Sequence, residues 1–324
     1  MNRIIIGVDI SKKKFDIAYL ATNQKWQRRI FANTLQGFEY FLKYLREEKF
    51  QNFHIVMEAT GRYGEPLACF LYEKGCHVSI VNPAQIKHYG RSLLKRTKTD
   101  KIDSQLITEF ALRHDLSLWH PLSPSLQALK EQVRCLEVFK KDVTRASNRL
   151  EHAQDFMVKK TLKEHLAFIQ KQIKELILTI TKLVQDDPKL TRQVTLLKGI
   201  PGIGTITALS LLAELPDLST FKCAKQLAAF AGLNPSIRTS GTSVKGKQSI
   251  SKMGRDSLRK ILFFPAMTLL RSSSPIKPFV EKLRTKGKVG KVIVAAVMRK
   301  LLHIIFGVLK RQSLFQEKLC SKTL

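Results

Sequence analysis

The order of strand-like and helix-like segments in the first 82 residues restricts the possible folds more than any other feature of this sequence. Three closely spaced runs rich in β-branched and apolar side chains come first, and two helical patterns then alternate with two further apolar runs. The strands are expected at residues 3–8, 15–20, 26–31, 54–57 and 77–81, and the helices at residues 38–45 and 67–74. This order predicts an antiparallel meander followed by an alternating unit, in a mixed α/β N-terminal domain.

The rest of the chain has a mainly helical pattern. Helical periodicity is continuous from residue 126 to 184, and apolar residues from Leu162 to Leu183 repeat at alternating intervals of four and three. This seam fits a helical hairpin that packs on its own domain, or a coiled coil that forms a dimer. After Asp187 and Pro188 a more basic, glycine-richer helical unit follows. The predicted domains are an α/β domain at residues 1–125, a helical coiled-coil linker or dimerisation region at 126–190, and a third domain at 191–324.

The charge balance indicates a polyanionic partner. The 324 residues include 56 Lys and Arg against 26 Asp and Glu, which gives a formal net charge of +30. Nucleic acid is the expected partner, because phosphate backbones attract clustered cations through counterion release. An anionic membrane surface is the weaker alternative, since the cations do not lie opposite an apolar stripe on one helix. The cysteines have no CxxC spacing and the polar N-terminus does not fit a signal peptide. We therefore expect a soluble cytoplasmic protein, associated with the nucleoid and not with a membrane.

Four acidic residues stand at positions where a metal site can form. Asp9 and Glu58 end two predicted core strands, and Asp100 and Asp103 are three residues apart, so that they share one face of a helix. If the two strands are neighbours, the carboxylates converge, and such a cluster needs a cation. Carboxylate oxygens suit Mg²⁺ or Mn²⁺, and a pair of such ions can support phosphodiester displacement. The structural alternative is a turn residue at Asp9, and a helix cap at Asp100 with Asp103 in the first turn.

Glycine-rich and basic segments in the last third of the chain are typical of phosphate binding. Residues 199–204 join two helical stretches through three glycines, like a helix-hairpin-helix, although a plain tight turn fits equally well. Residues 238–260 contain seven Lys or Arg and one acid. A serine in this segment can donate a hydrogen bond to phosphate or act as a nucleophile. The candidates that spacing leaves open are Ser240, Ser243, Ser249 and Ser251. The expected nucleic-acid contacts are Lys98, Gly202, Gly204, Arg238, Lys245, Lys247, Lys252 and Arg255.

Seven short motifs together resemble one protein family. They are GVDISK at residues 7–12, MEATG at 57–61, VNP at 81–83, KTDKID at 98–103, IPGIG at 200–204, FAGLNP at 230–235 and SG at 240–241. This combination resembles the DEDD transposases of the insertion-sequence one-ten family over nearly the whole chain. The resemblance implies an RNase H-like (RuvC-like) N-terminal domain, a coiled-coil linker and a mainly α C-terminal transposase domain with a helix-hairpin-helix. It implies that the four metal-binding carboxylates are Asp9, Glu58, Asp100 and Asp103, and that the catalytic serine is Ser240.

The resemblance also implies an activity and partners. The protein would be a DNA recombinase that uses Mg²⁺ and a serine nucleophile, with a covalent phosphoserine link to cleaved DNA. A structured noncoding guide RNA, the bridge RNA, would pair with donor and target DNA. Dimers would join into tetramers on DNA, with the carboxylate domain of one protomer completing a site with the serine domain of another. Two other interpretations stay open: a RuvC-like junction nuclease that uses metal-activated water without a serine, and a structural nucleic-acid binder without catalysis.

Overall fold

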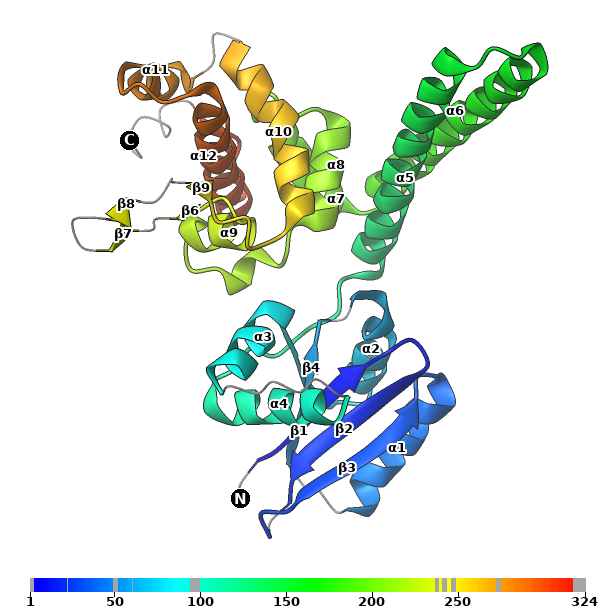
Figure 1. The fold of residues 1–324 in the computed structure, drawn as a ribbon, viewed down its shortest axis with the longest axis vertical. Coiled ribbons are helices and arrows are strands. Elements are labelled where there is room, and N and C mark those ends of the chain that lie inside the picture. Colours follow the sequence, from blue (N-terminus) through cyan, green and yellow to red (C-terminus); the bar gives the residue numbers. More distant parts are fainter. Residues whose placement is uncertain are drawn as a thin grey trace. The chain divides into compact units, whose positions relative to one another are not determined.

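The computed structural model shows two compact units (Figure 1). The units comprise Met1–Leu122 and Ser123–Leu324. The structure describes residues 3–21, 23–48, 52–59, 61–93, 100–236, 239–240, 244–245, 249–271 and 275–316. Within these ranges only the backbone is described for Arg62, Asp100, Lys101, Thr239, Ser240, Val244 and Lys245.

A five-stranded mixed sheet forms the centre of the first unit. Its strands are β1 (Ile4–Ile10), β2 (Lys14–Leu20), β3 (Trp26–Ala32), β4 (Phe53–Glu58) and β5 (His77–Val81). The strand order is β3-β2-β1-β4-β5, in which β1, β2 and β3 are antiparallel neighbours while β4 and β5 run parallel to β1. The predicted meander and the alternating unit after it are therefore confirmed.

Helices cover both faces of this sheet. They are α1 (Leu35–Glu47), the short 3₁₀ helix Gly61–Tyr63, α2 (Glu65–Glu73), α3 (Pro83–Ser92) and α4 (Asp100–Arg113). Successive strand residues point to opposite faces, so Ile6 and Val8 pack with the apolar residues of α1 and α2, whereas Val56 packs with those of α3 and α4. The mixed α/β character expected from the sequence follows from this arrangement.

The elements predicted from the sequence include no helix directly after the strand at residues 77–81, where Asn82 and Pro83 follow. The structure uses the same two residues to begin a helix. The Asn82 side chain accepts a hydrogen bond from the Ala84 N–H at 2.9 Å, and Pro83 occupies the first turn, where its missing N–H costs nothing.

Helix α4 lies directly on the middle of the sheet. A Cβ atom at Gly7 would collide with the carbonyl oxygen of Ser104 and the hydroxyl of Thr108. The Gly7 N–H donates to Thr108 Oγ1 at 3.0 Å, and this hydroxyl donates to the Ala18 carbonyl at 2.8 Å. The absence of a side chain at residue 7 thus allows α4 to pack against β1 and β2 at backbone distance.

A long helical hairpin opens the second unit. Helix α5 (Pro124–His152) and helix α6 (Phe156–Gln185) are joined by three residues and pack against each other (Figure 1). The apolar seam of α6 is half-buried or buried along its length, and Ile169 and Ile180 are its most buried members. The hairpin interpretation of this seam is confirmed, and dimerisation through the same region stays a prediction.

The remaining helices form the core of the second unit. They are α7 (Pro188–Lys198), α8 (Thr205–Glu214), the 3₁₀ turn Leu218–Thr220, α9 (Ala224–Phe230), α10 (Asp256–Arg271), α11 (Lys277–Thr285) and α12 (Gly290–Arg311). Among the described helices, α12 alone is long and apolar enough to cross a membrane, but half of that stretch is buried inside the fold. Val297, Leu301 and Ile305 are fully buried in the core. Packing inside the unit therefore accounts for the apolar character of α12.

Candidate carboxylate site and serine arm

Asp9 and Glu58 lie on neighbouring parallel strands. The ladder between β1 and β4 pairs Val8 with Met57, so Asp9 and Glu58 are the next residues along each strand. Neighbouring strands are about 4.8 Å apart, and alternation turns both residues to the face opposite Val8 and Met57. That is the face on which α4 packs, because Val56 shares it. The two strand ends therefore meet as expected from the sequence.

Asp100 and Asp103 lie in the first turn of α4, over the same face of the sheet. Asp103 is half-buried and stands one turn before Ile107, which is fully buried in the cluster that contains Val56. Asp100 is three residues earlier and so shares this stripe of the helix, although its side chain lies outside the described ones. Both positions therefore belong to the helix that covers the sheet face on which Asp9 and Glu58 lie.

A fifth acid, which the sequence analysis missed, lies beside Asp9. Asp16 is the antiparallel partner of Asp9 in the ladder between β1 and β2, so the two residues share one face. Asp16 is only 4% exposed, and its carboxylate pairs with Lys14 Nζ at 3.3 Å and Arg28 Nη2 at 3.7 Å. Like charges directly opposite each other are unfavourable, and these two cations offset that cost.

The donor chemistry of this face fits a hard divalent cation, but the described side chains do not by themselves form its ligand set. Carboxylate oxygens on two adjoining strand ends and on the facing helix are the groups that Mg²⁺ prefers. Among the side chains that the structure describes, no three His, Cys, Asp or Glu residues form a group able to hold a metal ion. The predicted set includes Asp100, whose side chain is not among them, so the metal site stays a prediction.

Ser240 lies on a short antiparallel arm, here called the serine arm, which spans residues 235–250. The arm contains β6 (Pro235–Ser236) paired with β9 (Ser249–Ile250), and β7 (Thr239–Ser240) paired with β8 (Val244–Lys245). Ser240 stands opposite Val244 in the second pair, and only its backbone is described. The sequence predicts no strand here. Two-residue strands leave no periodic pattern long enough to be recognised.

Three predicted phosphate contacts lie outside the described residues. These are Lys98, Arg238 and Lys247. Lys245 stands opposite Thr239 in the arm, and its backbone alone is described. Their roles stay predictions.

The base of the serine arm is held by a close backbone contact. A Cβ atom at Gly254 would collide with the Phe230 carbonyl oxygen, and Gly232 has a φ of 69°, which favours glycine. The Lys252 N–H donates to the Gly232 carbonyl at 3.2 Å, and the Arg255 N–H donates to the Phe230 carbonyl at 2.8 Å. The chain that leaves the arm is thereby fixed on the end of α9.

A buried carboxylate connects this base to two other helices. Glu214, the last residue of α8, is 8% exposed and accepts a hydrogen bond from Ser257 Oγ at 2.6 Å. Arg134 of α5 and Arg255 pair with the same carboxylate at 3.5 and 3.7 Å. Arg255 also donates to the Glu214 carbonyl at 3.3 Å. Arg255 is a predicted phosphate contact, and part of its guanidinium group is therefore already engaged by Glu214 inside the fold.

The predicted phosphate-binding hairpin is a tight connection between α7 and α8. Ile200 and Ile203 are buried, whereas Gly202 and Gly204 are exposed. Gly202 has a φ of 83°, a conformation that favours glycine, and a Cβ atom there would lie 3.1 Å from the Pro265 carbonyl oxygen of α10. Gly204 has open space around it and caps the N-terminus of α8, where backbone N–H groups can meet an anion. This geometry fits a phosphate contact and a plain turn alike.

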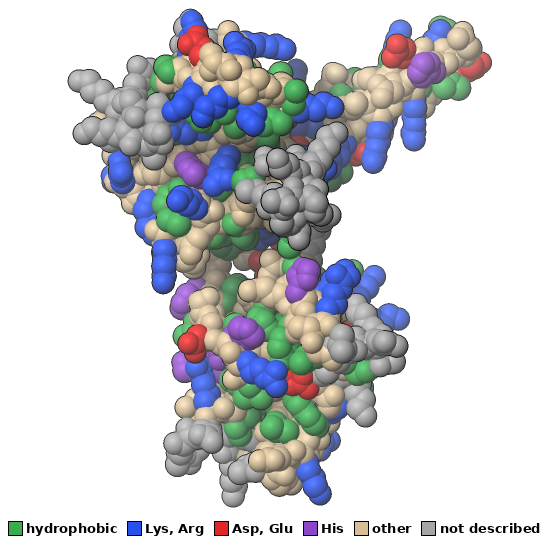
Figure 2. Space-filling view, turned by 60° about the vertical axis from the view of Figure 1, so that its left-hand side comes forward, with side chains coloured by type: hydrophobic (Ala, Val, Ile, Leu, Met, Phe, Trp, Pro, Cys, Tyr) green, Lys and Arg blue, Asp and Glu red, His purple; other side chains and the backbone are tan. Residues whose placement is uncertain are grey.

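Basic side chains are spread widely over the visible face of the molecule. Figure 2 shows many Lys and Arg side chains, in blue, and few acidic ones, in red. This distribution agrees with the net charge of +30 and with a polyanionic partner.

Comparison with known proteins gives matches along most of the chain. The family profile DEDD_Tnp_IS110, described as a transposase, matches residues 6–158, and the profile of the transposase IS116/IS110/IS902 family matches residues 194–281. A pilin gene-inverting protein of Moraxella bovis is 35% identical over 98% of this chain and 99% of its own length. A transposase for the insertion sequence element IS1111A of Coxiella burnetii is 26% identical over 82% of this chain and 78% of its own.

Proposed function

Because this chain belongs to the IS110 family of transposases, we propose that it recombines DNA with a metal-binding carboxylate site and a serine nucleophile. The carboxylates are Asp9, Glu58, Asp100 and Asp103, and the nucleophile is Ser240. The adjacency of Asp9 and Glu58 on β1 and β4, on the face of the sheet that α4 covers, carries the proposal. Mg²⁺ or Mn²⁺ bound there would stabilise negative charge on the oxygens of the scissile phosphate.

The chemistry of the proposed step is a transesterification. The Ser240 hydroxyl oxygen forms a bond to the scissile phosphorus, its proton passes to a base, and one strand oxygen leaves as a hydroxyl. The product is a phosphoserine ester that keeps the energy of the broken phosphodiester for rejoining. Cations of the serine arm and of residues 252–260 favour this step because negative charge builds up on the phosphoryl oxygens.

The proposal also includes finer features of the fold. The strand order β3-β2-β1-β4-β5 supports an RNase H-like (RuvC-like) domain. The turn between α7 and α8 supports a helix-hairpin-helix, and the helical hairpin supports a coiled-coil region at residues 126–190 between domains at 1–125 and 191–324.

We extend the proposal to the partners. The family resemblance suggests a bridge RNA that selects donor and target DNA, dimers that join into tetramers, and a carboxylate domain that works with the serine of another protomer. A net charge of +30 supports the binding of two nucleic acids at once. Work on chromosomal DNA would place the protein in the cytoplasm with the nucleoid.

DNA inversion is the second candidate for the outcome of recombination. The similarity to the pilin gene-inverting protein covers nearly the full length of both chains. The same cleavage and rejoining inverts a segment when both sites lie on one molecule in opposite orientation, and inserts an element when they lie on two.

Trapping a covalent adduct tests the serine chemistry. Protein incubated with Mg²⁺, labelled donor DNA and RNA from its own element is denatured and run on a gel. We expect a labelled protein band that Ser240→Ala removes and that Ser249→Ala, a change to an exposed serine of the same arm, leaves in place.

Two other results contradict this mechanism. Cleavage that persists in Ser240→Ala, with loss in Asp9→Asn, would identify a metal-dependent junction nuclease. Unchanged cleavage in Asp9→Asn and Asp103→Asn would show that these carboxylates are structural, and absence of cleavage in the wild type as well would identify a nucleic-acid binder without catalysis. Guidance by RNA is wrong if exchange of the pairing loops leaves the integration sites unchanged.

A further inference from the structure

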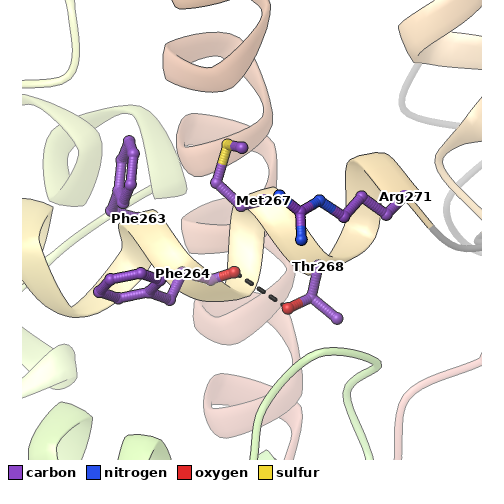
Figure 3. A pocket seen from close by; sticks show the side chains of 5 residues that line it. All are labelled: Phe263, Phe264, Met267, Thr268 and Arg271. Atoms are coloured by element: carbon purple, nitrogen blue, oxygen red, sulfur yellow. Dashed lines mark hydrogen bonds between the residues drawn. The ribbon is translucent and has the colours of Figure 1, made fainter.

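Two adjacent phenylalanines on α10 face solvent. Phe263 is 43% exposed and Phe264 is 75% exposed, and their rings meet edge to face at 5.5 Å (Figure 3). The core-facing residues of α10 are Leu258, Leu262, Pro265, Ala266 and Leu269. Both rings therefore lie off the buried stripe of the helix, and core packing does not explain them.

These rings border a groove of about 900 Å³ between α10 and α12, here called the aromatic groove. Its apolar lining includes Phe263, Phe264, Met267, Leu270, Ile293 and Met298. Ile250, in the last strand of the serine arm, lines the same groove. The aromatic groove therefore adjoins the arm that bears Ser240.

The rim of the aromatic groove is basic. Arg259, Lys260, Arg284 and Lys291 line it, and Arg271 follows the aromatic pair along α10. None of the described lining residues is Asp or Glu. Asp256 pairs with Arg259 at 2.9 Å and also contacts Lys260, so it offsets part of the charge at one end only.

We propose that the aromatic groove binds single-stranded DNA, with unpaired bases against Phe263 and Phe264 and phosphates against the rim cations. Every base has an aromatic face, so stacking tolerates any sequence but needs bases freed from their duplex partners. A second copy of this chain docked groove to groove fits poorly, because the basic rim of one copy would face the basic rim of the other. The choice of DNA rests on the proposed function, whose strand exchange leaves bases unpaired beside the serine arm.

Binding of labelled oligonucleotides to the full chain tests the proposal. The probes are an unstructured single strand of DNA, RNA of the same sequence and a DNA duplex of equal length. We expect Phe263→Ala and Phe264→Ala to weaken binding of single-stranded DNA by roughly five- to a hundredfold, and binding of duplex by less than about twofold. Phe168→Ala, which changes a 61% exposed phenylalanine of α6, should alter neither.

The salt dependence separates stacking from phosphate contacts. Lys291→Ala should lower the slope of log affinity against log salt for the single strand, whereas Phe264→Ala should leave that slope unchanged. Equal losses on duplex and single strand, no loss on single-stranded DNA, or a loss confined to RNA would overturn the proposal. A change of oligomeric state in Phe264→Ala would overturn it in favour of an interface between copies. Cleavage is not needed for this measurement, so the Ser240→Ala protein should bind the probes as the wild type does, whether or not the proposed serine chemistry is correct.

Discussion

At the scale of single residues, charge and burial decide which groups can take part in chemistry near the sheet. Asp16 shares a face with Asp9, but its carboxylate is paired with Lys14 and Arg28. It therefore contributes negative charge and packing, and its carboxylate is not available to bind a metal ion. The sequence carried a signal for it, because Asp16 interrupts the apolar run of the second strand. Only the register of the β1–β2 ladder reveals that it stands opposite Asp9.

A second buried polar group ties β4 and β5 to the segment that follows α4. His54 Nε2 donates to Ser79 Oγ at 2.8 Å, and this hydroxyl donates to the Ser117 carbonyl at 2.7 Å. Burial, with smaller contributions from Arg3 and His77, lowers the pKa of His54 to about 4 from 6.5. The imidazole is therefore neutral in the folded chain at pH 5, whereas in the unfolded chain it is protonated.

This difference predicts a stability that falls on acidification. The contribution of His54 is complete above pH 6.5 and is lost as the pH falls towards 4, by at most about 2 kcal/mol at pH 5. Urea unfolding of wild type and His54→Gln at pH 7 and pH 5 measures it. The variant should lose that part of the pH dependence, whereas His88→Gln, a change to an exposed histidine of α3, should keep it. Equal pH dependence in His54→Gln and wild type would contradict the assignment.

At the scale of elements, some parts of the fold could be predicted from the sequence and others could not. The five strands lie within about two residues of their predicted positions. Strands β1, β4 and β5 could be located because each is a short run of mostly apolar, β-branched side chains that is largely buried in the sheet. Asp9 and Glu58 could be recognised as site candidates for the same reason, since they end such runs. The serine arm could not be predicted, because its two-residue strands leave no periodic pattern. The Glu214 network could not, because it depends on contacts between residues some 40 to 80 positions apart.

The same limit applies to the aromatic groove. In the sequence Phe263 and Phe264 are simply apolar residues of a helix, and nothing distinguishes them from its core positions. Their exposure follows from the direction in which α10 packs against α12 and α8.

Glu214 should be the main electrostatic connection between α8, α5 and the start of α10. Glu214→Ala removes the partner of Arg134, Arg255 and Ser257, and leaves two half-buried guanidinium groups without it. We expect a loss of about 1–3 kcal/mol in the free energy of unfolding. The comparison is Glu175→Gln on α6, an exposed acid whose pair with Lys171 is 3.9 Å long, for which the loss should stay below about 0.5 kcal/mol. Similar values for both variants, by urea denaturation, would exclude this role.

At the scale of the whole molecule, the net charge governs binding that does not depend on sequence. An excess of 30 positive charges repels itself until phosphates replace the mobile anions around it. The wide distribution of cations explains why composition alone indicated a nucleic-acid partner, while the distinction between RNA and DNA needs the motifs and not the charge.

Affinity for random duplex DNA should therefore fall steeply with salt. Contact with about six phosphates predicts a decrease of roughly a thousandfold between about 50 and 200 mM monovalent salt. Fluorescence anisotropy of a labelled duplex of random sequence, titrated with the full chain at several salt concentrations, gives the slope. An affinity that stays constant across this range would show that the surface charge does not carry the binding.

The bare backbone at Gly7 has a consequence for the carboxylates around it. Two of the four proposed ligands belong to α4, and α4 reaches the sheet only because position 7 leaves room for Ser104 and Thr108. A methyl group at position 7 would push α4 away from the strands without changing any of the acidic residues. The position of Asp100 and Asp103 relative to the sheet thus depends on Gly7, a residue that has no side chain.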